Sequence, residues 1–320
     1  MIFFKFPFND TIYTTDENTD EKLVSFHAFD GDETLGFKGN IIPVSKEDIL
    51  KDEIFTDSVS YESDAEGETE QEYLEKLQEV IGFIKENKLR KLVIARRKKA
   101  EFGKVSLSKT FLNLSKTYPN AFAYLFISEN ECWIGAFSEL LGKLNKTTGE
   151  FETMSLAGTL PVDEQWSEKE IHEQKAVTDY IYEILLRYSE FVQQSETYDH
   201  PSGNIKHLRT DFKATVKAPQ LEKVISELHP TPAVCGFPKD FCKNAINNFE
   251  KYPREFYAGY SKIEMGNEVY FFVNLRCAKI YRNHADIFVG GGITAESSPE
   301  KEWHETELKS QAITKNLATL

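Results

Sequence analysis

The sequence lacks any long uninterrupted apolar segment. None of its apolar runs approaches the roughly 20 residues that a membrane-spanning helix needs. The first eight residues, Met-Ile-Phe-Phe-Lys-Phe-Pro-Phe, also lack the basic start, the extended apolar stretch and the small-residue cleavage site of a signal peptide. We therefore expect a soluble, cytoplasmic protein.

Positive charge and cysteine are both scarce. The 320 residues include 38 Lys and Arg against 52 Asp and Glu, which gives a formal net charge of −14. Nucleic acids and anionic membranes are bound by basic patches, so neither is expected as a partner. The four cysteines have no C-x-x-C spacing, which predicts small buried side chains rather than a disulfide framework or a zinc site; they are Cys132, Cys235, Cys242 and Cys277.

Apolar residues are plentiful enough to build a large core. Hydrophobic residues make up 40% of the chain and aromatic residues 13%, which excludes a wholly disordered protein. Residues 1–60 predict irregular strands, and an acidic run at 62–71 leads into a helix with apolar residues at helical spacing. The acidic run is expected to be an exposed connection.

Strands and helices are mixed along the rest of the chain without strict β-α-β alternation. Apolar or alternating segments predict strands at 91–96, 121–128, 132–137 and 206–216, a hairpin of 256–262 with 268–282, and a short strand at 287–289. Helices are expected to begin at Ser167, Pro219, Pro238 and Ser298. This order predicts an α+β protein with large, mostly antiparallel sheets and helices on the outside.

Two of the predicted helix starts carry a pair of glutamates three residues apart. The first reads Glu170-Ile-His-Glu173 and the second Glu302-Trp-His-Glu305. Surface helices contain many such pairs, and Glu170 is also placed to complete a capping box with Ser167. If both pairs instead face one cavity, their repulsion calls for a hard divalent cation, and Mg²⁺ fits oxygen ligands.

Three consecutive glycines, Gly290, Gly291 and Gly292, follow the strand at 287–289 and precede the last helix. They lack the spacing of a dinucleotide-binding loop. A tight turn is one interpretation. The other is a loop whose exposed backbone amides bind a carboxylate or a phosphate near the start of the helix.

Lys91 and Glu139 are candidate proton-transfer groups, because Lys91 is the first residue of one apolar strand and Glu139 lies at the end of another. Arginines near Lys91 in the sequence, together with burial, lower the pKa of a lysine toward the range of a general base. Burial of Glu139 raises the pKa of a carboxylic acid, as a general acid requires. The ordinary alternative is a solvated lysine and a strand-end carboxylate.

Three further polar residues lie in strand-like segments: His207, Tyr257 and Arg276. A histidine in a strand is more often structural than catalytic. Arg276 follows Phe271-Phe-Val-Asn-Leu275, and an unpaired guanidinium there is costly. Its partner is therefore either a carboxylate of the protein or a carboxylate of a ligand.

Together these segments resemble the chorismate-utilising enzymes, and most of all isochorismate synthase. The similar segments occur in the family's order over residues 88–318: Lys91-Leu-Val-Ile-Ala-Arg96, Trp133-Ile-Gly-Ala-Phe-Ser-Glu-Leu-Leu141, Met154-Ser-Leu-Ala-Gly-Thr-Leu-Pro161, Glu170–Glu173, Lys206-His-Leu-Arg-Thr210, Leu228-His-Pro-Thr-Pro-Ala-Val-Cys-Gly236, Arg254-Glu-Phe-Tyr-Ala-Gly-Tyr260, Asn274-Leu-Arg-Cys-Ala278, and Gly290 through Lys309. The resemblance implies a shortened N-terminal β-rich portion at 1–60 and a chorismate-binding catalytic core at 61–320, in one integrated domain.

The resemblance also implies a reaction and its residues. Chorismate, a small dianion, would be converted to isochorismate with Mg²⁺ as cofactor, Lys91 as the base that activates water for attack at C2, and Glu139 as the acid at the C4 hydroxyl. Glu173 and Glu305 match the family's magnesium ligands, and Glu170 and Glu302 match the carboxylates beside them. The residues that match substrate-binding positions are Gly158, Thr159, His207, Tyr257, Arg276, Gly290, Gly291, Gly292 and Lys309. A monomer is expected.

Two positions bear on the choice among related reactions. Enzymes that aminate chorismate, namely anthranilate and aminodeoxychorismate synthase component I, differ at the position of Lys91, and the latter often carry lysine in the segment of Ala157. Lys91 with Ala157 therefore favours water as the nucleophile. A salicylate synthase, which shares the same acid and base and goes on to eliminate pyruvate, stays open, and so does the pathway served, whether menaquinone, a siderophore or salicylate.

The sequence departs from the family's pattern in three places. Gln174 stands where a histidine usually follows the ligand glutamate, and Gly291 occupies a position that is commonly alanine. The segment Arg209-Thr-Asp211 replaces a more apolar or proline-containing one. None of these changes removes a proposed catalytic group.

Overall fold

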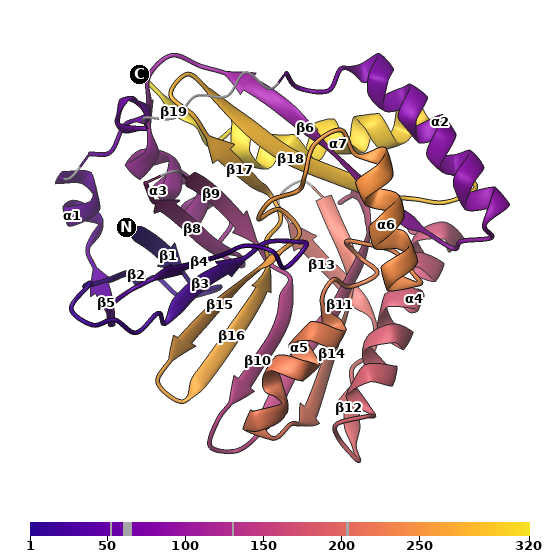
Figure 1. The fold of residues 1–320 in the computed structure, drawn as a ribbon, viewed down its shortest axis with the longest axis horizontal. Coiled ribbons are helices and arrows are strands. Elements are labelled where there is room, and N and C mark those ends of the chain that lie inside the picture. Colours follow the sequence, from indigo (N-terminus) through magenta and orange to yellow (C-terminus); the bar gives the residue numbers. More distant parts are fainter. Residues whose placement is uncertain (52, 60–65, 130, 203–204) are drawn as a thin grey trace.

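The computed structural model describes residues 1–51, 53–59, 66–129, 131–202 and 205–320, and two large antiparallel sheets dominate it (Figure 1). The first, eight-stranded sheet has the order β5-β2-β1-β8-β9-β17-β18-β6. Its strands are β1 (Ile2–Lys5), β2 (Ile12–Thr15), β5 (Ile41–Val44), β6 (Leu92–Glu101), β8 (Phe122–Ile127), β9 (Cys132–Phe137), β17 (Cys277–Ile280) and β18 (His284–Ile293).

The second sheet has nine strands in the order β12-β14-β11-β10-β16-β15-β3-β4, with β13 also paired to β14. Its strands are β3 (Val24–His27), β4 (Thr34–Phe37), β10 (Leu140–Asn145), β11 (Glu150–Pro161), β12 (Val192–Gln194), β13 (Tyr198–Ser202), β14 (Ile205–Thr215), β15 (Tyr260–Met265) and β16 (Glu268–Val273). A small third sheet joins β7 (Val105–Ser106) to β19 (Ala318–Thr319).

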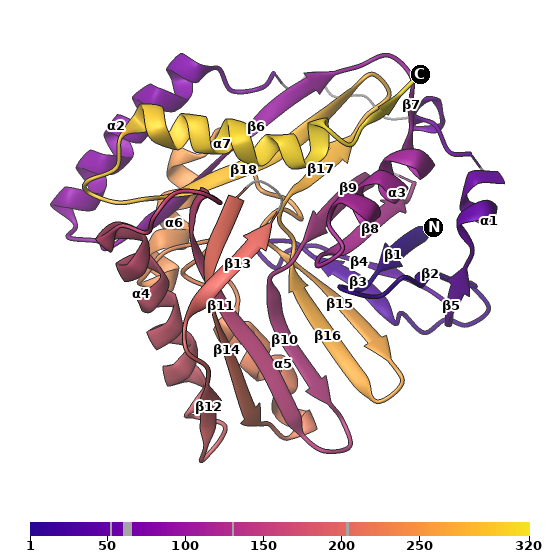
Figure 2. The ribbon, with the colours of Figure 1, turned by 180° about the vertical axis from the view of Figure 1, so that it is seen from behind.

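The helices lie around the outside of the sheets (Figures 1 and 2). They are α1 (Lys46–Lys51), α2 (Glu70–Glu86), α3 (Leu107–Thr117), α4 (Glu168–Leu185), α5 (Leu221–Leu228), α6 (Lys239–Phe249) and α7 (Pro299–Thr314). This arrangement confirms the predicted α+β class. No helix within the described ranges is both long and apolar enough to cross a membrane.

The N-terminal segment contributes to both sheets. In the first sheet, β1 pairs with β8, and β2 and β5 follow it to the edge. In the second sheet, β3 pairs with β15, and β4 follows it to the edge. The expected boundary after residue 60, and residues 62–65 of the acidic run, lie outside the described residues. The remainder of that run leads into α2, and the division of the chain at residue 60 stays a prediction.

Alternate side chains of β8 fill two different cores. Phe122, Tyr124 and Phe126 point into the large core between the sheets, and Ala123 and Leu125 point into a second core beneath α3. The alternation follows from the two-residue repeat of a strand. Both faces of the first sheet are therefore buried here, which explains a strand without polar residues. The four cysteines are buried, as predicted.

The chain passes from one sheet to the other at two neighbouring places. Ser138 and Glu139 connect β9 of the first sheet to β10 of the second, and residues 274–276 connect β16 of the second sheet to β17 of the first. The backbone N–H of Ala136 donates to the carbonyl of Arg276 at 3.2 Å, and the N–H of Val273 donates to that of Glu139 at 3.0 Å. The two crossovers therefore lie side by side.

The prediction of a hairpin between 256–262 and 268–282 was only partly right. Strands β15 and β16 do pair around Gly266, but the second arm ends at Val273 and the chain then enters the other sheet. The apolar sequence runs through both strands because both are buried, so it carries no sign of the crossover between them.

Candidate active site

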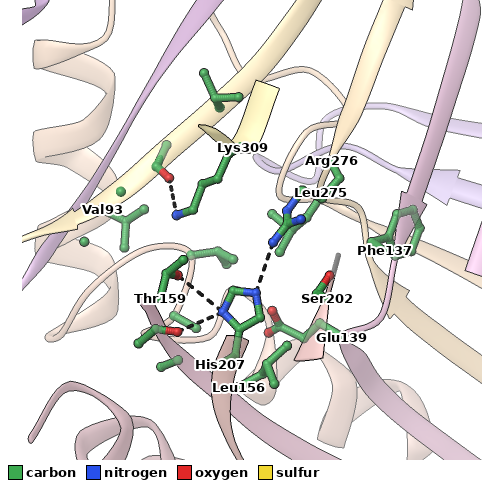
Figure 3. Close-up of a pocket in the computed structure, with 18 of the residues that line it drawn as sticks. Val93, Phe137, Glu139, Leu156, Thr159, Ser202, His207, Leu275, Arg276 and Lys309 are labelled. Atoms are coloured by element: carbon green, nitrogen blue, oxygen red, sulfur yellow. Dashed lines mark hydrogen bonds between the residues drawn. The ribbon is translucent and has the colours of Figure 1, made fainter. Parts of the chain in front are cut away.

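A pocket opens where the two crossovers meet β11, β14, β18, the start of α4 and the middle of α7. Glu139 and Arg276 enter it from the crossovers, Thr159 and His207 from neighbouring strands, and Lys309 from α7 (Figure 3). Of the residues predicted from the sequence, those that line the pocket are Glu139, Gly158, Thr159, Glu170, Glu173, His207, Tyr257, Arg276, Gly290, Gly291, Gly292, Glu305 and Lys309. Lys91 and Glu302 do not line it themselves but contact residues that do.

Glu139 is buried, with 4% of its surface exposed, at the point where the chain leaves the first sheet. Burial raises the pKa of its carboxyl to about 7, against the opposing influence of the Lys91 charge and the Thr231 hydroxyl. A carboxylic acid with this pKa keeps a proton near neutral pH and loses it readily, which is the property of a general acid.

Lys91 precedes β6 and reaches toward the start of α4. Its Nζ lies 2.5 Å from Oε1 of Glu173. Burial alone would raise the pKa of Glu173, but Lys91 and two further lysines hold it below its usual value. A side chain at Gly292 would meet the Lys91 Nζ and Glu173 Oε1 at 2.9 Å each, so the two charged groups would have to shift to admit it.

The two glutamate pairs converge on one region of the pocket. A bridge of 3.0 Å from Lys169 on α4 to Glu302 on α7 joins the two helix starts, and Glu173 and Glu305 both line the pocket. Burial and the charge of Glu305 raise the pKa of Glu302. The carboxylates of Glu302 and Glu305 are therefore close enough to repel each other.

Both ordinary interpretations of the glutamates are also present. Glu170 accepts hydrogen bonds from the Ser167 N–H and hydroxyl in a capping box, and Glu305 pairs with Lys309 at 2.7 Å. Among the described residues, no three Asp, Glu, His or Cys side chains already stand in a metal-binding arrangement. Each glutamate instead has a polar partner of its own.

The donor set nevertheless fits a hard cation. Carboxylate oxygens are the ligands that Mg²⁺ prefers, and Glu173 and Glu305 supply them from two helices. Burial first, and then the charge of Glu305, raise the pKa of Glu302, and a cation bound nearby would relieve the repulsion between the two carboxylates. Gly291 leaves room for this carboxylate, because a side chain there would lie 2.9 Å from Glu302 Oε2.

The expectation that Gly290, Gly291 and Gly292 form a loop was wrong. They lie within β18 and pair with Ala95, Ile94 and Val93 of β6. Strand β17 pairs with β18 only as far as Ile287, so the other edge of β18 is open beside the pocket at the glycines. Glycine is required here for space, since a side chain at Gly290 would meet the Ile94 carbonyl at 2.9 Å and the Tyr257 hydroxyl at 3.0 Å.

Arg276 is half-buried, and its guanidinium forms no ion pair with any carboxylate of the described residues. Its Nη2 donates to Nε2 of His207 at 3.0 Å (Figure 3), and its backbone has a φ of 47°, a costly conformation for a residue with a side chain. Of the two partners considered from the sequence, the structure therefore favours a carboxylate of a ligand.

His207 holds Arg276 without neutralising it. Its Nδ1 lies 2.8 Å from the Gly158 carbonyl and 3.3 Å from the Thr159 hydroxyl. Burial, and then the charge of Arg276, lower the pKa of His207 well below its usual value. The ring is therefore neutral, with the proton on Nδ1 and with Nε2 accepting from Arg276. The Gly158 carbonyl faces His207 where the pairing of β11 with β14 becomes irregular.

Several residues of the pocket could not be predicted from the sequence. Lys169 sits among ordinary helix-start residues, and Tyr118, which follows α3, lies in none of the recognised segments. Tyr118, Lys169 and Ser202 line the pocket only because distant segments meet there.

The departure at Gln174 has a structural explanation. Its Nε2 lies within 3.0 Å of the hydroxyls of Ser155, Thr178 and Thr210, all of them buried. The amide thus joins α4 to β11 and β14 at the position that follows Glu173 in the sequence. Thr210 belongs to the segment Arg209-Thr-Asp211, so two of the departures serve the same polar cluster.

Comparisons with known proteins identify the family of the chain. The family model described as chorismate binding enzyme matches residues 44–318. The salicylate biosynthesis isochorismate synthase of Pseudomonas aeruginosa is 26% identical over 279 residues, which cover 81% of this chain and 57% of the relative. Isochorismate synthase EntC of Escherichia coli is 34% identical over 195 residues, covering 55% and 48%. The chain belongs to the chorismate-binding enzyme family.

The fold has a close match among solved structures. MenF, the menaquinone-specific isochorismate synthase from Escherichia coli, superimposes with a TM-score of 0.80 at 19% identity, over 98% of this chain and 88% of that one. The chain spans about half the length of the curated relatives it matches.

Proposed function

We propose that the protein is a magnesium-dependent isochorismate synthase that converts chorismate to isochorismate. The observation that carries the proposal is that Glu139, a buried acid with a pKa of about 7, is close enough to Lys91 to be influenced by its charge. An acid and an amine at one pocket are the two groups that the exchange of a hydroxyl between two ring carbons needs.

The proposed reaction is balanced without any oxidant or reductant. The Lys91 amine accepts a proton from water as the water oxygen bonds to C2 of the ring. The ring double bonds shift, the C4–O bond breaks, and Glu139 gives its proton to the departing hydroxyl, which leaves as water. Water therefore enters and leaves, and the product is an isomer of the substrate.

The pocket offers suitable groups for a dianionic substrate. Arg276 is a half-buried cation without a carboxylate partner in the described residues. Lys309 and the open edge of β18 at the glycines add positive charge and amide donors. Glu173 and Glu305 would hold the magnesium ion, with Glu170 and Glu302 beside them. When bound, the ion supplies positive charge for a substrate carboxylate.

The experiment is a product assay. The purified protein is incubated with chorismate and Mg²⁺, and the mixture is separated by chromatography. We expect isochorismate, with no product when EDTA removes the metal. Salicylate with pyruvate would instead identify a salicylate synthase, and an ammonia-dependent product would identify an aminating enzyme. Chorismate bound but recovered unchanged would contradict every enzymatic interpretation.

Other features of the proposal rest on the sequence alone. The monomeric state and the cytoplasmic location stay predictions.

A further inference from the structure

Tyr118 is a pocket residue outside every segment that resembles the family. It caps the C-terminal end of α3, where its N–H donates to the Leu114 carbonyl at 2.9 Å. The following turn is fixed on two sides. Pro119 accepts a hydrogen bond from the N–H of Phe8 at 2.7 Å, and Asn120 donates to the Pro201 carbonyl on β13 at 3.0 Å.

The side chain of Tyr118 bridges an apolar core and the pocket. It packs against the second core, beneath α3, while the residue also lines the pocket together with Arg276. Its hydroxyl has no hydrogen-bond partner among the described residues. A rigid tyrosine with an unused hydroxyl at a pocket is well placed to bind a polar ligand group.

The electrostatic environment relates Tyr118 to Arg276 in particular. Burial lowers the pKa of Arg276, and Tyr118 is the largest influence in the opposite direction, ahead of Tyr257 and Glu305. Conversely, burial raises the pKa of Tyr118 and Arg276 opposes that shift. Both residues line one pocket, so a ligand bound at the guanidinium lies in the same cavity as the Tyr118 side chain.

We propose that the Tyr118 hydroxyl donates a hydrogen bond to the same substrate carboxylate that Arg276 binds. The inference rests on the proposed function, since it takes chorismate as the ligand. It assigns Tyr118 to substrate binding, a role distinct from the proton transfers of Lys91 and Glu139.

The chemistry of a carboxylate suits this arrangement. Its two oxygens offer about four lone-pair sites, and an arginine fork occupies two of them. A phenol hydroxyl can satisfy one of the others without adding charge. Because His207 leaves the charge of Arg276 uncompensated, the pair provides one cation and one neutral donor, which favours a carboxylate over a neutral group.

The test is Tyr118→Phe, which removes only the hydroxyl. Hydrogen bonds to charged groups contribute about 1.5–3 kcal/mol, so we expect KM for chorismate to rise about tenfold or more while kcat stays within about twofold. The matched control is Tyr188→Phe. The Tyr188 hydroxyl binds Glu227 at 2.6 Å beyond the end of α4, away from the pocket, and its loss should leave KM unchanged.

A double-mutant cycle distinguishes direct binding from a structural role. Arg276→Gln should weaken binding strongly, and Tyr118→Phe should then add little, because both residues act on one carboxylate. An unchanged KM in Tyr118→Phe, or equal effects of this change with and without Arg276, would overturn the inference. A fall in Tm together with a fall in kcat would assign Tyr118 a structural role and would overturn it too.

Failure of this inference is separable from failure of the proposed function. If the wild-type protein binds chorismate without converting it, the activity is wrong, but calorimetric titration of chorismate into wild type and Tyr118→Phe still tests the inference. A tenfold weaker affinity of the variant supports it, and equal affinities contradict it.

Discussion

Nζ of Lys91 lies 2.5 Å from Oε1 of Glu173, although 82 positions separate the two residues along the chain. The proposed base and a proposed magnesium ligand thus share one contact, between the start of β6 and the first turns of α4. An ammonium group and a divalent cation compete for the same carboxylate oxygen. The base and the metal site are therefore coupled, which leads to the first prediction.

Lys91→Met should abolish most of the activity and tighten Mg²⁺ binding. Loss of the base is expected to lower kcat by about 10²–10⁴-fold, whereas loss of the competing charge at Glu173 should raise the affinity for Mg²⁺ several-fold. Isothermal titration calorimetry measures the second effect without any turnover. Lys175→Met is the control, because Lys175 is an exposed lysine of α4 paired with Asp179. Weaker Mg²⁺ binding in Lys91→Met would contradict the coupling.

Glu139→Gln should lose activity and gain stability at alkaline pH. The folded-state pKa of about 7 lies above the usual 4.5. The contribution of Glu139 to the free energy of unfolding is therefore greatest below pH 4.5, and it is lost as the pH rises through 7. The full shift corresponds to at most about 3 kcal/mol at pH 8. Glutamine removes that cost. We expect a higher Tm than wild type at pH 8 and little difference at pH 4.5. Equal Tm differences at both pH values would show that Glu139 titrates normally.

Glu173→Ala should raise the magnesium concentration needed for half-maximal activity, because one carboxylate ligand is lost. Titration of activity against free Mg²⁺ measures the change. Glu168→Ala offers a control on the same helix, since Glu168 is exposed at the first position of α4. A normal Mg²⁺ requirement in Glu173→Ala, or an identical shift in both variants, would remove Glu173 from the metal site.

Gly292→Ala should lower activity by displacing the base. The added methyl group would lie 2.3 Å from Lys91 Cε and 2.9 Å from Glu173 Oε1, so the pair must move. Gly82→Ala in α2 serves as the comparison, because nothing lies within 4 Å of its added methyl group, and it should stabilise the helix by about 0.5–1 kcal/mol. Activity of Gly292→Ala equal to wild type would show that the tight fit at β18 is irrelevant to function.

Local features were predictable from the sequence and long-range ones were not. The capping box at Ser167 and Glu170 depends on neighbours in the chain, and it starts α4 as predicted. The crossovers at Glu139 and Arg276 depend on which sheet each flanking strand joins, and apolar strands of both sheets look alike. For the same reason the three glycines were expected in a loop, since the crowding that requires them comes from Lys91, Tyr257 and Glu302 on other elements.

The convergence of the two glutamate pairs could likewise not be predicted from local sequence patterns. Each pair alone is typical of an exposed helix, and the contacts of a capping box and an (i, i+4) ion pair are indeed present. Order along the chain, through resemblance to a known family, predicted that the pairs would meet. The spacing within each pair could not predict this convergence. Tyr118 has no recognisable pattern around it in the sequence and was not predicted as a pocket residue.

Isotope labelling tests the central claim most directly. The protein is incubated with chorismate and Mg²⁺ in water enriched in ¹⁸O, and the product is examined by mass spectrometry. The account predicts isochorismate carrying one ¹⁸O atom, in its C2 hydroxyl, because water attacks C2 while the C4 hydroxyl leaves. Isochorismate without ¹⁸O, or a complete absence of isochorismate, would contradict the roles assigned to Lys91 and Glu139.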